Sequence, residues 1–168
     1  MHPSNAPARV SRVAACRPAL SLLALAGLLL LVACATSARF PARHYVPVSR
    51  EVQPMGEMVL SNTELRLGSL EGEMKLEYVG LMEDKAGKDL AGATVYRVKN
   101  AEGYFKKNTG RQGYCAEPPR WVAVNSETGA PAWSTEIWVA FLTVEDWSQF
   151  TPAAHHYCAG GSYVRAAD

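Results

Sequence analysis

Apolar and polar residues alternate with a period of two over several short stretches of the chain. Met74 to Val79 alternates apolar with charged side chains, as a strand with one buried face does. Thr94 to Lys99 combines β-branched and aromatic residues with charges on one side. Trp121 to Val124 is a short apolar run that ends at Asn125. Each stretch predicts a strand.

The segment from Thr135 to Val144 predicts the most buried strand. It reads Thr-Glu-Ile-Trp-Val-Ala-Phe-Leu-Thr-Val and is apolar on both faces. A continuous apolar run is typical of a central strand covered on both sides. A helix is the competing interpretation, but the β-branched residues, such as Ile137 and Val139, favour a strand.

Weaker strand patterns lie at 57–61, 63–68 and 162–165, and turn residues separate the strands. Short strands spaced by such turns predict a mainly β fold: a small antiparallel sheet, barrel or sandwich. One short helix is expected near 144–150. Thr143 is a suitable N-cap, and Glu145 and Asp146 fall in the first turn.

The N-terminal third has a different pattern. Residues 1–17 are polar and basic, and residues 19–33 carry no charge. A positive segment followed by an apolar core and small residues is typical of a signal peptide. The apolar run is shorter than the roughly 20 residues that a membrane-spanning helix needs. Residues 1–33 are therefore predicted to be a signal peptide.

Leu31-Val32-Ala33-Cys34 resembles the lipobox of bacterial lipoproteins, in which an aliphatic and a small residue precede an obligatory cysteine. The resemblance covers about residues 1–36. It implies cleavage between Ala33 and Cys34 and a diacylglycerol on the Cys34 thiol. Two or more acyl chains anchor a protein stably to a membrane. A secretory signal with a chance cysteine and a short membrane anchor are the alternatives.

The resemblance also implies a location. An Asp after the lipidated cysteine tends to retain Gram-negative lipoproteins at the inner membrane, and Ala35 stands there. We therefore expect the protein in the inner leaflet of the outer membrane, facing the periplasm. The membrane is then one partner, reached through the lipid anchor.

Residues 34–56 are predicted to be a lipidated cysteine followed by a flexible tether, and residues 57–168 a single β-rich domain. The tether contains three prolines and no hydrophobic period. Its arginines, Arg39, Arg43 and Arg50, are either solvated or in contact with anionic lipid headgroups. Both interpretations stay open at this point.

Composition and charge exclude some function classes. The 168 residues carry a formal net charge of +1 and are 48% hydrophobic, which is too apolar for a disordered chain. Residues 1–33 hold three arginines and no acid, so 14 basic and 16 acidic residues remain from position 34 onward. This near-balance argues against a nucleic-acid binder.

The cysteines indicate one disulfide. Cys16 lies in the signal peptide and Cys34 in the lipobox, which leaves Cys115 and Cys158. In an oxidising compartment such a pair most often forms a disulfide. The competing interpretation is a zinc site with the histidines of His155-His156-Tyr157-Cys158, but the paired ligand spacing of zinc sites is absent. We expect no metal and no cofactor.

The segment 103–114 is the candidate ligand-binding surface, because it combines cations with aromatic rings and contains no acid. Such residues stack on sugar rings or bind phosphate and carboxylate groups. The alternative is a hairpin in which the rings pack and the cations are solvated. The candidate residues are Tyr104, Phe105, Lys106, Lys107, Arg111 and Tyr114.

No catalytic motif stands out, so the sequence favours a binding or structural lipoprotein over an enzyme. Its expected partner is an envelope protein or a glycan. One alternative is a cell-wall hydrolase that uses Glu145, Asp146 and a histidine of the pair 155–156. Another is a lysozyme inhibitor, because some small lipid-anchored inhibitors are similar in size, anchor and architecture; architecture alone does not imply that function.

Overall fold

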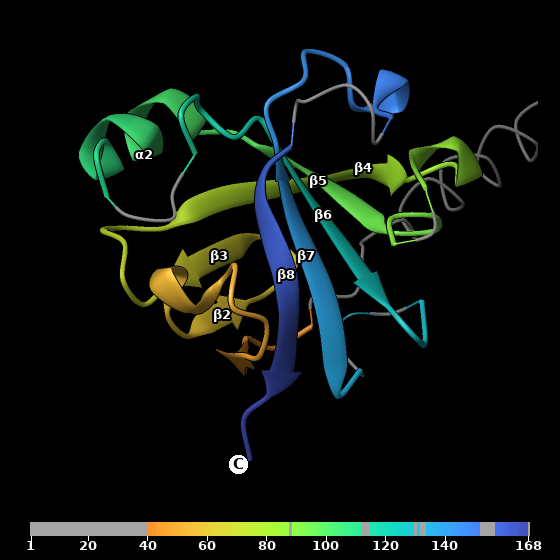
Figure 1. Cartoon of the computed structure of the whole chain (residues 1–168), viewed down its shortest axis with the longest axis horizontal. Coiled ribbons are helices and arrows are strands. Elements are labelled where there is room, and N and C mark those ends of the chain that lie inside the picture. The colour runs from red at the N-terminus through yellow and green to blue at the C-terminus, as the bar shows by residue number, and fades with distance from the viewer. Residues whose placement is uncertain are drawn as a thin grey trace, which may run out of the picture. The chain divides into compact units, whose positions relative to one another are not determined.

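Eight antiparallel strands close into a barrel in the computed structural model of the chain (Figure 1). The structure describes residues 40–87, 89–111, 115–129, 131, 134–151 and 157–167. They belong to one compact unit, Arg39–Asp168. Each strand pairs with the next along the chain, and the last pairs with the first. The predicted mainly β, antiparallel fold is confirmed, and of the three architectures the barrel is the one formed.

The elements follow one another in a simple meander. Among the described residues they are β1 (Arg43–Pro47), η1 (Gln53–Met55), β2 (Met58–Leu60), β3 (Glu64–Leu67), β4 (Met74–Leu81), η2 (Asp84–Ala86), β5 (Thr94–Val98), α2 (Ala101–Asn108), β6 (Trp121–Ser126), β7 (Glu136–Leu142), η4 (Trp147–Gln149) and β8 (Tyr157–Arg165).

Strand β7 is covered on both faces, as predicted. Ile137, Val139 and Phe141 point into the barrel and are at most 1% exposed. The intervening Ala140 and Leu142 point outward and are also fully buried. Because side chains alternate between the two faces of a strand, the inward-pointing residues of β7 join a cluster inside the barrel and the outward-pointing ones join a second cluster on its outer surface.

The outer cluster is covered by two loops. The β4–β5 loop contributes Met82 and Leu90, and the segment after β7 contributes Val144 and Phe150. The Nε1–H of Trp121 donates to the Val144 carbonyl oxygen at 2.8 Å, which fixes that segment on the outer face of the sheet. A buried indole N–H needs such an acceptor.

Strand β1 corrects the predicted tether. Residues 43–47 pair with β2 on one side and with β8 on the other, and they close the barrel. Val52 and Met55, which follow β1, are 0% exposed. The prediction of a flexible segment up to residue 56 is therefore wrong from Arg43 onward; residues 34–39 lie outside the described residues.

The helical segments also differ from the prediction. The expected helix near 144–150 is one short 3-10 turn, η4, which is capped by Asp146 rather than Thr143. The Asp146 side chain accepts a hydrogen bond from the Ser148 N–H at 2.9 Å. The α-helix that the structure describes is α2, at 101–108, where a loop or hairpin was expected.

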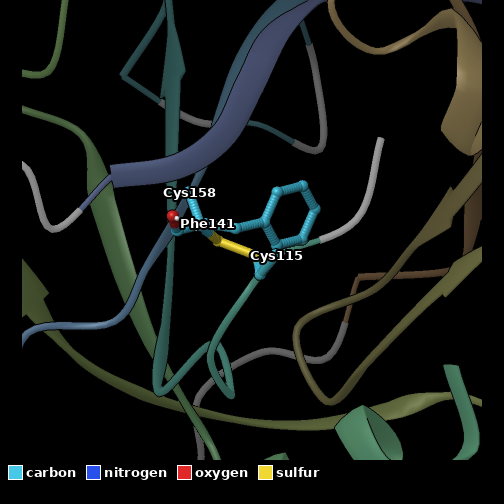
Figure 2. The surroundings of a disulfide bond; sticks show 3 residues. All are labelled: Cys115, Phe141 and Cys158. Carbon is cyan, nitrogen blue, oxygen red and sulfur yellow. Dashed lines mark hydrogen bonds between the residues drawn. A yellow bond between two sulfur atoms is a disulfide. The ribbon is translucent and has the colours of Figure 1, made fainter. Parts of the chain in front are cut away.

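Cys115 and Cys158 form the predicted disulfide (Figure 2). The pairing of β7 with β8 shifts at Phe141 and Leu142, so Cys158 lies at a bulge of β8. Its sulfur lies 3.2 Å from the Phe141 carbonyl oxygen, a packing contact because a disulfide sulfur has no proton to donate. The bond ties the segment before β6 to the start of β8.

Replacing both Cys115 and Cys158 by Ala should lower the free energy of unfolding by about 4 kcal/mol, because the bond restricts the unfolded chain across a sequence separation of 43. Urea unfolding followed by tryptophan fluorescence measures this difference. The wild-type chain in excess reductant should lose the same stability. Equal stability of the oxidised wild type and the double variant would contradict the prediction.

Candidate functional site

Helix α2 brings the predicted binding segment to the surface of the β3–β4 hairpin. Glu102 lies in its first turn, and Lys106 and Lys107 lie in its last turn, the arrangement that the helix dipole favours. In the sequence, Gly103 and the neighbouring aromatic residues obscure the helical pattern. The change from an acidic residue, Glu102, to the basic Lys106 and Lys107 is the feature from which the helix could have been predicted.

Two asparagines fasten the ends of α2 to the hairpin. The Asn100 amide donates to the Glu73 carbonyl oxygen at 2.9 Å and accepts from the Lys75 N–H at 2.8 Å. The Asn108 amide makes the same pair of contacts with the backbone of Glu71, at 3.2 and 2.8 Å. Each side chain satisfies a backbone donor and acceptor, so the helix is held rigidly at both ends.

A groove lies between the hairpin and α2. Its volume is about 570 Å³. It is lined by Arg66, Leu67, Gly68, Leu70, Gly72, Glu73, Lys75, Asn100 and Lys107. Lys107 thus belongs both to the predicted segment and to the groove, whereas the strand residues come from a part of the sequence with no binding motif.

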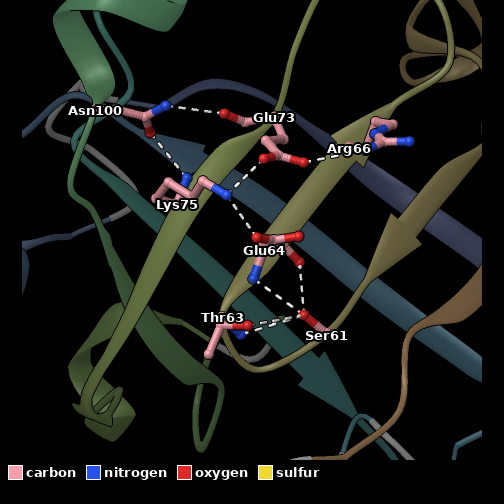
Figure 3. A network of polar contacts seen from close by, with 7 residues as sticks. All are labelled: Ser61, Thr63, Glu64, Arg66, Glu73, Lys75 and Asn100. Carbon is pink, nitrogen blue, oxygen red and sulfur yellow. Dashed lines mark hydrogen bonds and ion pairs between the residues drawn. The ribbon is translucent and has the colours of Figure 1, made fainter.

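A network of ion pairs crosses the hairpin beside the groove (Figure 3). Lys75 Nζ lies 2.5 Å from both Glu64 Oε1 and Glu73 Oε1, and Arg66 Nη2 lies 3.1 Å from Glu73 Oε2. Arg111 pairs with Glu71 and also donates to the Ser69 carbonyl oxygen at 3.1 Å. The cations of the hairpin are therefore already neutralised by carboxylates.

Lys106 and Lys107 differ from these cations. Both are exposed, and within the described part of the chain neither forms an ion pair or a side-chain hydrogen bond. Lys107 lines the groove, and Lys106 precedes it on the same helix. A carboxylate or phosphate group that enters the groove would meet Lys107 without first having to break an existing pair.

The aromatic candidates have another role. Tyr104 is 2% exposed and packs in the inner cluster, and burial raises the pKa of its hydroxyl to about 12. Phe105 is half-buried, and Tyr114 lies outside the described residues. The expectation that Tyr104 offers its ring to a ligand is therefore wrong. The polar side chains that line the groove are instead those of Arg66, Glu73, Lys75, Asn100 and Lys107.

The electrostatics of the groove favour binding over proton transfer. Hydrogen bonds from Lys75 and then Arg66 lower the pKa of the Glu73 carboxyl. Hydrogen bonds to Glu64 and then Glu73 raise the pKa of Lys75. Both groups hold their charges firmly near neutral pH, and a general acid or base must exchange its proton there.

Of the residues expected for a hydrolase, the structure describes Glu145 and Asp146. Asp146 caps η4, Glu145 is exposed, and His155 and His156 lie outside the described residues. A second pocket of about 270 Å³ does contain carboxylates. It lies at the opposite end of the barrel from α2 and is lined by Asn125, Ser126, Glu127, Glu136, Ile137, Trp138 and Ser162.

Comparison with known proteins identifies no relative: no family model, curated protein or solved structure matches the chain. No helix within the described ranges is both long enough and apolar enough to cross a membrane. Among the same residues, no three His, Cys, Asp or Glu side chains gather where they could hold a metal ion.

Replacing Asn108 by Ala should destabilise the protein by about 2 kcal/mol, because Asn108 is 0% exposed and its loss leaves the backbone of Glu71 without partners. Thermal or urea unfolding measures the loss. Lys107→Ala is the matched control, since it changes the same helix without removing a hydrogen bond. If both variants are equally stable, Asn108 does not fasten the helix.

Proposed function

We propose that the protein is a lipid-anchored lipoprotein of the periplasmic face of the outer membrane that binds an anionic component of the cell envelope. The lipobox at Leu31-Val32-Ala33-Cys34 supports the anchor. The exposed Lys107 in the lining of the α2 groove, with Lys106 before it on the helix, supports binding and is the observation that carries the proposal.

The rigidity of the groove favours this function. A helix fastened at both ends keeps the backbone of Lys106 and Lys107 in place before a ligand arrives, so little backbone entropy is lost on binding. The ion-paired hairpin alongside adds polar groups that stay ordered. The ligand is an envelope glycan or protein that presents carboxylate or phosphate groups.

A cell-wall hydrolase is the second candidate, and the pocket between β6 and β7 favours it. Glu127 and Glu136 line that pocket together with Trp138. Glycosidases use two carboxylates on either side of the bond that they cut. Lysozyme inhibition stays a weaker alternative, because it rests on size, anchor and architecture.

Replacing Cys34 by Ser should abolish fatty-acid incorporation and release the protein from the membrane fraction, because the thiol is the site of acylation implied by the lipobox. Metabolic labelling with an alkynyl palmitate, followed by membrane fractionation, checks this. Cys16→Ser is the matched control and should stay labelled. A Cys34→Ser protein that is still labelled and membrane-bound would contradict the proposal that Cys34 carries the lipid anchor.

Changing Lys106 and Lys107 together to Glu should weaken co-sedimentation with purified peptidoglycan sacculi by about fivefold to tenfold, as expected for two reversed charges. Arg50 and Arg120, which are exposed outside the groove, provide the matched double reversal. Equal binding of the two double variants would reject the groove as the binding surface.

The same incubation separates the two candidate functions. Intact sacculi with retained protein support binding. Soluble glycan fragments that disappear when Glu127 or Glu136 is changed to Gln would support the hydrolase instead.

A further inference from the structure

The pocket between β6 and β7 has a lining that is both acidic and aromatic. Its volume is about 270 Å³. Trp138 lines it, and the cross-strand neighbours of Trp138, Asn125 on β6 and Ser162 on β8, share the same face of the sheet. Glu136 lies two residues before Trp138 and therefore on that face as well. The register of three strands thus gathers these side chains around one pocket.

Two glutamates line the pocket from the two ends of the β6–β7 loop. Glu127 directly follows β6, and Glu136 is the first residue of β7. Both are exposed, and in the described part of the chain neither forms an ion pair or a side-chain hydrogen bond. None of the described residues that line the pocket is Lys, Arg or His. The pocket therefore presents two negative charges that no ion pair among these residues neutralises.

The other lining residues form a polar wall beside an apolar one. The Asn125 amide donates to the Asp89 carbonyl oxygen at 2.8 Å and accepts from the Ser126 N–H at 2.8 Å, so it is held in place without a ligand. Trp138 is half-buried and packs against the outer hydrophobic cluster. Ser126 also lines the pocket, and its Oγ is buried without a hydrogen-bond partner among the described residues. Because buried hydroxyl groups are hydrogen-bonded with few exceptions, a pocket bounded by this residue favours a polar ligand.

We propose that this pocket binds a primary ammonium group at the end of a short alkyl chain. An ammonium group has three N–H donors and no acceptor, and the carboxylates of Glu127 and Glu136 accept hydrogen bonds. Such charge-assisted hydrogen bonds are about twice as strong as those between neutral groups. The Trp138 indole provides an apolar wall for the alkyl chain, and the face of an indole attracts a cation.

The charge of the pocket separates this ligand from the others proposed for the protein. Glu127 and Glu136 repel a carboxylate or phosphate group, so the ligand is of opposite sign to that of the α2 groove. A glycosidase needs one carboxyl group protonated and the other ionised, whereas ammonium binding uses both in the ionised form. The site depends neither on the lipid anchor nor on the α2 groove and therefore goes beyond the function proposed above.

The test uses the full-length protein, purified in detergent, and cadaverine, a linear alkyl diamine, as the probe. Equilibrium dialysis at constant ionic strength should show saturable binding of cadaverine. Pentanol, which has the alkyl chain without an ammonium group, should not bind. Glu127→Gln and Glu136→Gln should each weaken cadaverine binding about threefold to fivefold, as expected for exposed charges, and the double variant about tenfold. Glu117→Gln is the matched control, because Glu117 is exposed and precedes the other end of β6.

An absence of saturable cadaverine binding would overturn the proposal, and so would equal binding by the wild type and the double variant. The ammonium group has two possible sources, which a second probe, Nα-acetyl-lysine amide, distinguishes. Tighter binding of cadaverine assigns the site to a soluble polyamine, and tighter binding of the lysine amide assigns it to a lysine side chain of another protein. Neither Cys34 nor Lys107 takes part in these measurements, so a failure of the function proposed above leaves this test unaffected.

Discussion

Closure of the barrel between β1 and β8 is the constraint on which the rest of the structure depends. An open sheet of this length would expose two rows of unpaired backbone groups, and closure removes both edges. The closing strand has only five residues, with Pro41 shortly before it and Pro47 as its last residue. Its pairing places Tyr45 in the core, and Val52, five residues after the strand, is buried in the same hydrophobic cluster. A segment that reads as a linker is therefore part of the core.

The segment after β1 can approach β8 closely only because residue 161 is a glycine. A Cβ atom at Gly161 would lie 2.0 Å from Ser49 Oγ and 3.0 Å from Val52 Cγ1. Ser49 Oγ also accepts a hydrogen bond from the Ser162 N–H at 3.0 Å, so the segment after β1 rests directly on β8. The disulfide at Cys158 fixes the start of the same strand. Strand β8 thus joins the N-terminal segment to the middle of the chain.

The sequence predicts the elements whose pattern is local. The two-sided apolar run at 135–144 indicates β7, and alternation indicates β4 and β5. It misses β1, which is short and ends in a proline, and α2, in which Gly103 interrupts a short amphipathic pattern. In the groove, the basic run at 106–107 is visible as a motif. Arg66 and Glu73 are not, because only the β3–β4 pairing makes them neighbours.

The packed interior decides where this barrel can bind a ligand. An eight-stranded barrel is just wide enough to be filled by side chains, and Tyr45, Phe141 and Tyr163 are each at most 1% exposed. A ligand must therefore be recognised at the ends or on the outer surface, where loops and helix ends meet the strands. The groove beside α2 lies at one such end. The packed core holds α2 and the β3–β4 hairpin in fixed positions, so in the function that we propose the chemistry of residues such as Lys107, rather than the barrel itself, selects the ligand.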